Sequence, residues 1–335
     1  MRRAARALTL LPFALVAVLA VGLAIAGRLS THDAVTVGPP AATPAAEAAA
    51  LSPSATLSPS VAPSPSASVA AASASPTPTA APSANANDAA EMLRVHNELR
   101  AAIGAPAVRA DQRVATAAQR HAEYLAQNDA LGHDETPGAP GFTGASVRDR
   151  LNAQGYTDAN ASEVATSFGT GADGVRSLWI LPYHRLGLMH PHAVVAGWGH
   201  AASAGRTVTV GVLVYDFDAP APDRVRSPAA DQRVAGTYSG EEVPDVLPAG
   251  ASRPVGYPIM VVYSSARAVE LRKARVIDAN GRDLAYHVVP QLYERDYVAI
   301  VPATPLAPGT RYRVRLELRV AGADVADEWE FETER

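Results

Sequence analysis

Hydrophobic residues are distributed unevenly along the 335-residue chain, and the first quarter differs from the rest. Residues 7–27 hold no charged side chain, a length that lets a helix cross a hydrocarbon core about 30 Å thick. Residues 39–87 are almost wholly Ala, Pro, Ser and Thr, and Glu47 is their one charge. Such a tract cannot bury enough apolar area to offset the entropy of ordering it, so we expect a disordered, extended stalk.

The apolar segment near the N-terminus is preceded by arginines at positions 2, 3 and 6, which is typical of an export signal. Everything after Arg28 is then expected outside the cytoplasm. The length of the segment favours an uncleaved membrane anchor, whereas Ala24-Ile25-Ala26 offers a cleavage site, and both alternatives stay open. The protein is therefore predicted to be secreted or extracytoplasmic, and anchored by its N-terminal helix if that helix is not removed.

From residue 88 onward apolar residues recur at helical spacing. Asp88 and Glu91 form a capping-box pattern before a first helix, which Gly104 ends. Asp111 is predicted to cap a second helix, which ends near Gly132. Its inner face is Val114, Ala118, His121 and Leu125.

Shorter elements follow the second helix. Helices are expected over 146–155 and 173–180, the latter capped by Asp173, with a polar loop between them up to Glu163. The β-branched runs 193–201 and 207–217 predict a hairpin. This region therefore predicts an α/β layered domain of roughly 130 residues, an ordinary size for one core.

After a proline-rich connection the pattern changes to strands alone, predicted at 258–264, 269–278, 283–289, 296–302, 310–320 and 327–333. In the fifth of these, apolar residues alternate strictly with charged ones, so one face of the strand is expected in the core and the other exposed to solvent. The C-terminal part is therefore predicted to be an all-β sandwich of about 100 residues.

Composition and motifs exclude several classes of protein. The chain has no cysteine, which excludes disulfides, thiolate nucleophiles and Cys-type zinc sites. Its net charge of −4 and the lack of an arginine-rich run give no reason to expect nucleic acid as a partner. The sequence has no G-x-S-x-G elbow, H-E-x-x-H helix, P-loop or dinucleotide fingerprint. Candidate chemistry is therefore left to histidines and carboxylates.

Several of these segments together resemble one family. Four segments occur in the same order as in CAP domains, the superfamily of cysteine-rich secretory proteins, antigen 5 and pathogenesis-related 1. They are HNELRAAIGAPAVRADQRVATAAQRHAEYLAQNDALGH, FTGASVRDRLNAQGY, LWILPYHR and the strand GWG. The likeness covers about 92–218 and is strongest to the bacterial SCP-like branch. The C-terminal part resembles the bacterial Ig-like domains that follow exported SCP-like domains. The resemblance implies a CAP-type α-β-α sandwich followed by an Ig-like sandwich.

The predicted organisation is thus a signal peptide or signal anchor (1–28), a stalk (29–87), a CAP domain (88–218), a linker (219–252) and an Ig-like β-sandwich (253–335).

In well-known CAP domains two histidines and two glutamates face a central cleft and can hold a divalent metal. Carried over position by position, the resemblance implies His133, Glu163 and His184 as this set. The sequence departs from the family, because Glu163 stands in SEVA and the insert that brings the second glutamate is missing. Two imidazoles and one carboxylate would leave zinc an open position. The alternative, which stays open, is a hydrogen-bonded polar cluster that ties loops together without metal.

The remaining histidines are expected to have other roles. His96 and His121 stand on core-facing helix positions, where a hydrogen-bonded packing role is the commoner outcome. His190 and His192 flank Pro191 and are expected in a solvated surface turn, and Arg185 is expected to anchor the turn at His184.

These observations favour an exported, non-enzymatic CAP-domain protein whose polar cleft binds a divalent metal, such as zinc, or a small lipid-like ligand or cell-envelope component. One alternative is a metal-dependent hydrolase acting on peptide or cell-wall material. Another is a purely structural display or adhesion protein. No catalytic residue is assigned from the sequence.

Overall fold

The computed structural model describes residues 84–335, apart from residues 204, 241, 266 and 267. All described residues belong to one compact unit. The expected export segment, and the stalk except for its last residues, lie outside the described part. Within the described part, no helix combines the length and apolar character needed to cross a membrane.

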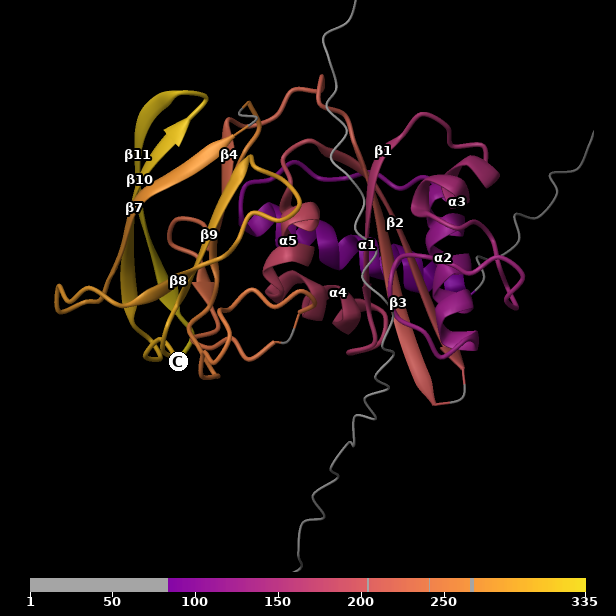
Figure 1. Cartoon of the computed structure of the whole chain (residues 1–335), viewed down its shortest axis with the longest axis horizontal. Helices are drawn as coiled ribbons and strands as arrows, with labels where there is room; N and C mark the ends of the chain where they lie inside the picture. Colours follow the sequence, from indigo (N-terminus) through magenta and orange to yellow (C-terminus); the bar gives the residue numbers. More distant parts are fainter. Residues whose placement is uncertain (1–83, 204, 241, 266–267) are drawn as a thin grey trace, which may run out of the picture. The chain divides into compact units, whose positions relative to one another are not determined.

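A three-stranded antiparallel sheet forms the centre of the N-terminal half of this unit (Figure 1). Its strands are β1 (Asn160–Thr166), β2 (Ala193–Ser203) and β3 (Arg206–Tyr215), in the order β1-β3-β2. The predicted hairpin is confirmed by β2 and β3. The loop expected up to Glu163 is wrong, because Glu163 lies within β1, opposite Val212 of β3. Pairing with a buried neighbour makes this polar stretch a strand.

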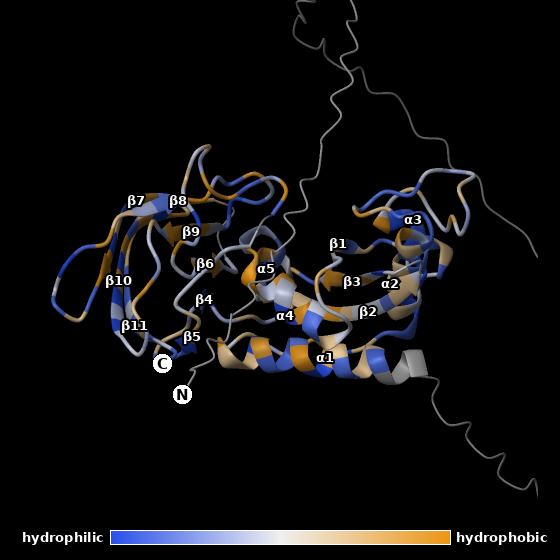
Figure 2. Ribbon diagram, turned by 90° about the horizontal axis from the view of Figure 1, so that it is seen from below, coloured by the Kyte–Doolittle hydropathy of each residue, from blue (hydrophilic) through white to orange (hydrophobic). Residues whose placement is uncertain are grey.

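Five helices cover the two faces of the sheet: α1 (Ala84–Ala102), α2 (Gln112–Gln127), α3 (Val147–Ala153), α4 (Ala172–Ile180) and α5 (Pro182–Met189). Figure 1 shows α2 and α3 on one side of the sheet and α4 and α5 on the other, with α1 running behind the strands. The predicted α-β-α layering is therefore observed. Figure 2 shows hydrophobic and hydrophilic residues interspersed along α1, as expected of a helix with one buried side.

The helix ends agree only partly with the sequence patterns. Asp111 accepts a hydrogen bond from Arg113 N and caps α2 as predicted. In contrast, α1 begins at Ala84, so Asp88 lies inside the helix instead of capping it. Two of the four residues upstream of the expected cap, Ala84 and Ala86, are of the type that most favours a helix. The cap predicted at Asp173 is also wrong, because Gly171 precedes α4 and no side chain caps it.

Glycines allow α2 to lie unusually close to the sheet. A Cβ on Gly197 would be 2.4 Å from the backbone of Val114 and Ala115, and one on Gly199 would be 2.4 Å from that of Gln119. The next residue, Trp198, points to the opposite face and packs edge-on against His96 of α1. The Gly-x-Gly pattern therefore sets the spacing between α2 and β2.

The C-terminal half consists of two four-stranded sheets. One has the order β5-β11-β10-β7 and the other β4-β6-β9-β8. The strands are β4 (Arg224–Ser227), β5 (Arg233–Val234), β6 (Ile259–Tyr263), β7 (Val269–Ile277), β8 (Tyr286–Val288), β9 (Tyr297–Pro302), β10 (Arg311–Val320) and β11 (Ala323–Thr333). The strict alternation predicted for β10 is confirmed by its burial pattern. A sandwich-like arrangement of sheets is thus observed, while an Ig-like topology stays a prediction.

The sheet that contains β6 and β9 is buried on both faces. Ile259 and Val261 of β6 belong to a core shared with β7, β10 and β11. The alternating residues Met260 and Val262 belong to a second core, which also contains Trp179 and residues of α1 and α5. The predicted linker contributes β4, which pairs with β6, and β5, which pairs with β11. The two halves are therefore joined by a continuous hydrophobic core.

Candidate functional site

A cavity of about 530 Å³ brings together all three residues that the sequence analysis singled out. His133, Glu163 and His184 line it, although 51 positions separate the two histidines in the sequence. His133 lies in a loop after α2, Glu163 in β1 and His184 in α5. The cavity is thus built where the edge of the central sheet meets the two helical layers.

Glu163 is the most buried of the three, with 2% of its side chain exposed. Arg150 Nη2 donates to its Oε2 at 2.8 Å. His133 Nδ1 and His121 Nε2 lie 3.2 and 3.3 Å from its Oε1. A buried carboxylate needs such a charge partner and hydrogen bonds. Both oxygens of Glu163 are therefore engaged within the protein.

Glu135 holds the loop that carries His133. It accepts hydrogen bonds from the backbone N–H groups of Thr143 and Gly144, at 2.5 and 3.2 Å, and lies 2.9 Å from His121 Nδ1. His121 thus lies between two carboxylates, those of Glu135 and Glu163, fully buried. The hydrogen-bonded packing role expected for His121 is confirmed.

His184 is paired with a residue that the sequence analysis did not consider. Its Nδ1 lies 2.5 Å from Oε1 of Glu242, in the segment expected to be a linker. Glu242 also accepts hydrogen bonds from the N–H groups of Tyr183 and His184, at 3.1 and 2.9 Å. Helix α5 has no side-chain cap of its own. The buried carboxylate of Glu242 accepts hydrogen bonds from the backbone N–H groups of the first turn, and its negative charge is favourable at the positive end of the helix dipole.

Sequence reasoning missed Glu242 because it follows His184 by 58 residues. The only signal available was a pair of acidic residues, Glu241-Glu242, in a turn-rich stretch. His184 itself lies in the first turn of α5.

The two imidazoles that line the cavity are arranged alike. Each has Nδ1 against a carboxylate, Glu163 for His133 and Glu242 for His184. In the described part of the chain, neither Nε2 has a hydrogen-bond partner. The His133 side chain is 54% exposed and that of His184 is 18% exposed. Carboxylates thus orient both rings, as they do for histidines that bind ligands through the other nitrogen.

A three-ligand metal set is not formed by these residues. Among residues 84–335, excluding the four gaps, no group of three or more His, Asp or Glu side chains is arranged to hold a metal ion. Glu163 would have to release Arg150 or the histidines to become a ligand. The residues as placed therefore do not fit the predicted zinc site. The carboxylates orient the imidazole rings instead of serving as metal ligands.

A further wall of the cavity comes from the C-terminal half and from the segment just after β3. It includes Phe217, Tyr293, Glu294 and Asp296. The exposed fractions of Phe217 and Tyr293 are 56% and 61%, large for aromatic residues. Burial raises the pKa of the Glu294 carboxyl, and the nearby charge of Asp296 raises it further. This wall is therefore both aromatic and acidic.

The prediction that His190 and His192 occupy a solvated turn is wrong. Only 5% and 7% of these residues are exposed, because the C-terminal half packs over them. His190 Nε2 lies 2.9 Å from Asp296 Oδ2, and His190 Nδ1 accepts a hydrogen bond from His192 N. His192 Nε2 lies 3.1 Å from the carbonyl oxygen of Ser264. These histidines therefore join the two halves of the unit.

Two buried arginines hold α5 in place. Arg100 donates to the carbonyl oxygens of Leu188 and His190, and burial lowers its pKa to about 10. Arg185 donates to the carbonyl of Trp179 at 2.5 Å and to Ser227 Oγ at 3.1 Å. The anchoring role predicted for Arg185 is confirmed, and it extends into the C-terminal half.

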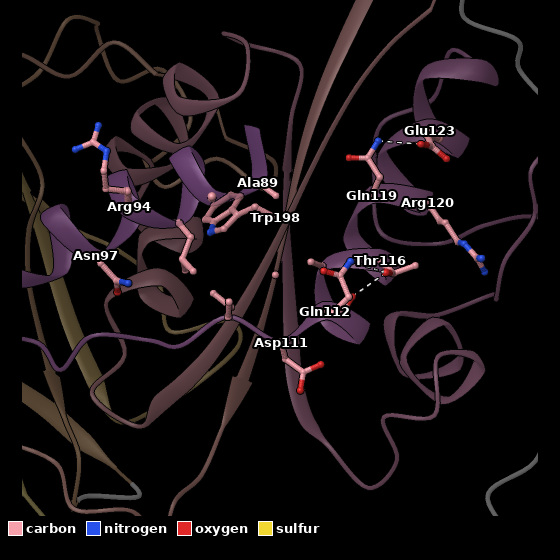
Figure 3. Close-up of a pocket in the computed structure, with 16 residues that line it drawn as sticks. Ala89, Arg94, Asn97, Asp111, Gln112, Thr116, Gln119, Arg120, Glu123 and Trp198 are labelled. Atoms are coloured by element: carbon pink, nitrogen blue, oxygen red, sulfur yellow. Dashed lines mark hydrogen bonds between the residues drawn. The ribbon is translucent and has the colours of Figure 1, made fainter. Parts of the chain in front are cut away.

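A second cavity, of about 610 Å³, contains none of the predicted residues (Figure 3). It lies between α1 and α2 over β2, with Trp198 among its lining residues. Figure 3 shows the hydrogen bonds from Gln112 to Thr116 and from Gln119 to Glu123 along α2. Other polar side chains of this lining bond to backbone outside their helices, Asn97 to Val108 and Gln119 to His200. Since none of the predicted site residues lines this cavity, the cavity at β1 is the better candidate.

Comparison with known proteins supports the expected family. The family model for "Cysteine-rich secretory protein family" (CAP) matches residues 93–215. No curated protein matches the chain.

Solved structures show weaker likenesses. An extracellular protein containing an SCP domain from Bacillus anthracis is 17% identical, with a TM-score of 0.33, over 39% of this chain and 41% of that one. A cysteine-rich secretory protein from Staphylococcus aureus is 16% identical, with a TM-score of 0.30, over 40% of each chain. CopC from Methylosinus trichosporium is 18% identical, with a TM-score of 0.24, over 32% of this chain and 88% of that one.

These TM-scores are low, so the assignment depends on the family model and on the residues quoted from the sequence. Residues 93–215 form a domain of the cysteine-rich secretory protein (CAP) family.

Proposed function

We propose that this chain is an exported, non-enzymatic protein whose CAP domain binds a ligand in the cavity at β1. One observation supports this above all: His133 and His184 line the same cavity, and each is oriented by a buried carboxylate, with no partner for its Nε2 among the described residues. Binding sites combine apolar walls with a few oriented polar groups, and this cavity has both. Export is supported by the apolar segment at 7–27.

A binding role fits the carboxylates better than catalysis. A general base must be able to accept a proton from the reacting group. Both oxygens of Glu163 are taken by Arg150, His121 and His133, and both oxygens of Glu242 by the first turn of α5 and His184. The two glutamates therefore position imidazoles, and no hydrolytic step is assigned to them.

Metal binding stays a prediction, but Glu163 would no longer be one of the metal ligands. The imidazoles of His133 and His184 would be the ligands, and Glu163 and Glu242 would orient them. Metal analysis of the purified full chain, beside a His133→Ala/His184→Ala variant, tests this. Metal lost only from the variant would support it, and equal metal content in both would contradict it.

The proposed binding site is tested by blocking its entrance. Val243 lines the cavity and is 93% exposed, so Val243→Trp should narrow the cavity without disturbing a core. Val288 is also exposed, at 53%, but lies elsewhere, and Val288→Trp is the matched control.

Native mass spectrometry and thermal shift of the full chain would be run with zinc ions, a sixteen-carbon fatty acid and a short basic peptide. We expect at least one probe to bind the wild type and Val288→Trp, and to bind Val243→Trp at least tenfold more weakly. Equal binding to Val243→Trp, or no binding of any probe, would refute the proposed function.

A further inference from the structure

The cavity passes along the free edge of β1. Its lining includes the consecutive residues 160–164 of this strand. Successive side chains of a strand point to opposite faces. Ser162 bonds to Tyr215 OH, on the side where α5 packs, whereas Glu163 reaches Arg150 of α3, on the other side. A single cavity that touches both faces must run past the edge of the strand.

This edge has no strand beside it in the described part of the chain. There, β1 pairs only with β3, and β1 ends the order β1-β3-β2. The backbone bonds found between elements include none from residues 160–164. An edge strand presents unpaired N–H and C=O groups that can pair with another chain. The floor of the cavity is therefore a row of backbone donors and acceptors.

We propose that the cavity binds an extended peptide segment, which pairs with β1 as a fourth strand of the sheet and carries a lysine or arginine side chain toward Asp296 and Glu294. In such strand addition, main-chain hydrogen bonds give affinity and pockets for alternate side chains give specificity. Five residues of strand span roughly 17 Å, so the ligand segment is about five or six residues long.

The preference for a basic side chain follows from the aromatic and acidic wall of the cavity. Asp296 Oδ2 is paired with His190, but Asp296 Oδ1 is buried and has no hydrogen-bond partner within the described residues. Glu294 lies beside it in the lining. Exposed Phe217 and Tyr293 add aromatic rings, over which a cation is attracted. A lysine or arginine would supply the missing donor and the opposite charge.

This inference rests on the proposed function, because it names the ligand class of the same cavity. The probe is a fluorescein-labelled hexapeptide, TVKVTV, blocked at both ends. Two matched peptides test the two parts of the proposal: TVEVTV reverses the charge, and TVKVTV methylated on alternate backbone nitrogens removes donors without changing side chains. Binding to the full chain is measured by fluorescence anisotropy.

We expect TVKVTV to bind, and both matched peptides to bind at least tenfold more weakly. Glu294→Gln should weaken binding of TVKVTV severalfold, while Glu270→Gln, at an exposed position outside the cavity, should leave it unchanged. Equal binding of the methylated peptide would overturn strand pairing, and equal binding of TVEVTV would overturn the charge preference.

Failure of the inference can be told from failure of the proposed function. If no hexapeptide binds while zinc or the fatty acid binds and Val243→Trp abolishes that binding, the peptide inference falls and the proposed function stands. If the chain instead forms a dimer whose dissociation alone permits peptide binding, the edge is an interface between copies and the inference is likewise overturned.

Discussion

Glu242 offers the sharpest test of how the site is built, because one carboxylate caps α5 and orients His184. Glu242→Ala removes the acceptor of two backbone N–H groups and of the His184 ring. Glu242→Gln keeps an acceptor oxygen but loses the negative charge at the start of the helix. Glu98→Ala, at an exposed position of α1, is the control for loss of a glutamate.

The expected cost follows from those contacts. Loss of an N-cap acceptor destabilises a protein by roughly 0.5–2 kcal/mol. The N–H of Tyr183 is buried and would be left without a partner, which costs about 1–3 kcal/mol. The N–H of His184 is only partly buried and can turn to water. We therefore expect Glu242→Ala to lower the free energy of unfolding by about 2–4 kcal/mol, and Glu242→Gln by about half as much.

Urea unfolding followed by tryptophan fluorescence measures this, since Trp179 and Trp198 lie in the core that contains α5 residues. With a slope of about 2–3 kcal/mol per molar urea, the midpoint should fall by roughly 0.7–2 M for Glu242→Ala. Glu98→Ala should stay within about 0.5 kcal/mol of the wild type. A Glu242→Ala protein as stable as Glu98→Ala would show that this carboxylate does not hold the helix.

Two further predictions concern buried residues of the CAP domain. Burial lowers the pKa of His96 from 6.5 to about 3. Between these two pH values the unfolded chain binds a proton that the folded chain does not. The free energy of unfolding should therefore fall by about 1.4 kcal/mol for each pH unit by which the pH drops. His96→Gln should remove that slope in urea titrations at pH 4, 5 and 7, and an unchanged slope would contradict the assignment. Gly199→Ala should cost about 1–3 kcal/mol in thermal or urea unfolding, because its Cβ would lie 2.4 Å from the Gln119 backbone; an unchanged stability would refute the close packing of α2 on β2.

The elements with strong local patterns were predictable from the sequence. The alternation in β10, the cap at Asp111 and the β2–β3 hairpin each depend on residues within about 20 positions of one another. The strand β1 was not predictable in this way. Its residues NASEVAT have a weak pattern, and only pairing with the buried strand β3 makes them a strand.

The site was predictable in its position but not in its contacts. The family resemblance placed His133, Glu163 and His184 together, and they line one cavity. It could not reveal that Arg150 and His121 would contact Glu163, because both come from helices whose packing fixes their direction. Periodicity identifies which side of a helix is buried, but not which polar group a buried side chain meets.

The C-terminal half contributes directly to the cavity and to the histidines beside it. Asp296 reaches His190, and Glu294 and Tyr293 line the cavity. The predicted linker supplies Glu242 to His184. These contacts lie beside a core that contains residues of both halves, so separating the halves would expose apolar surface and leave buried charges unpaired. The site therefore belongs to the whole unit, and the CAP domain alone would carry an incomplete cavity.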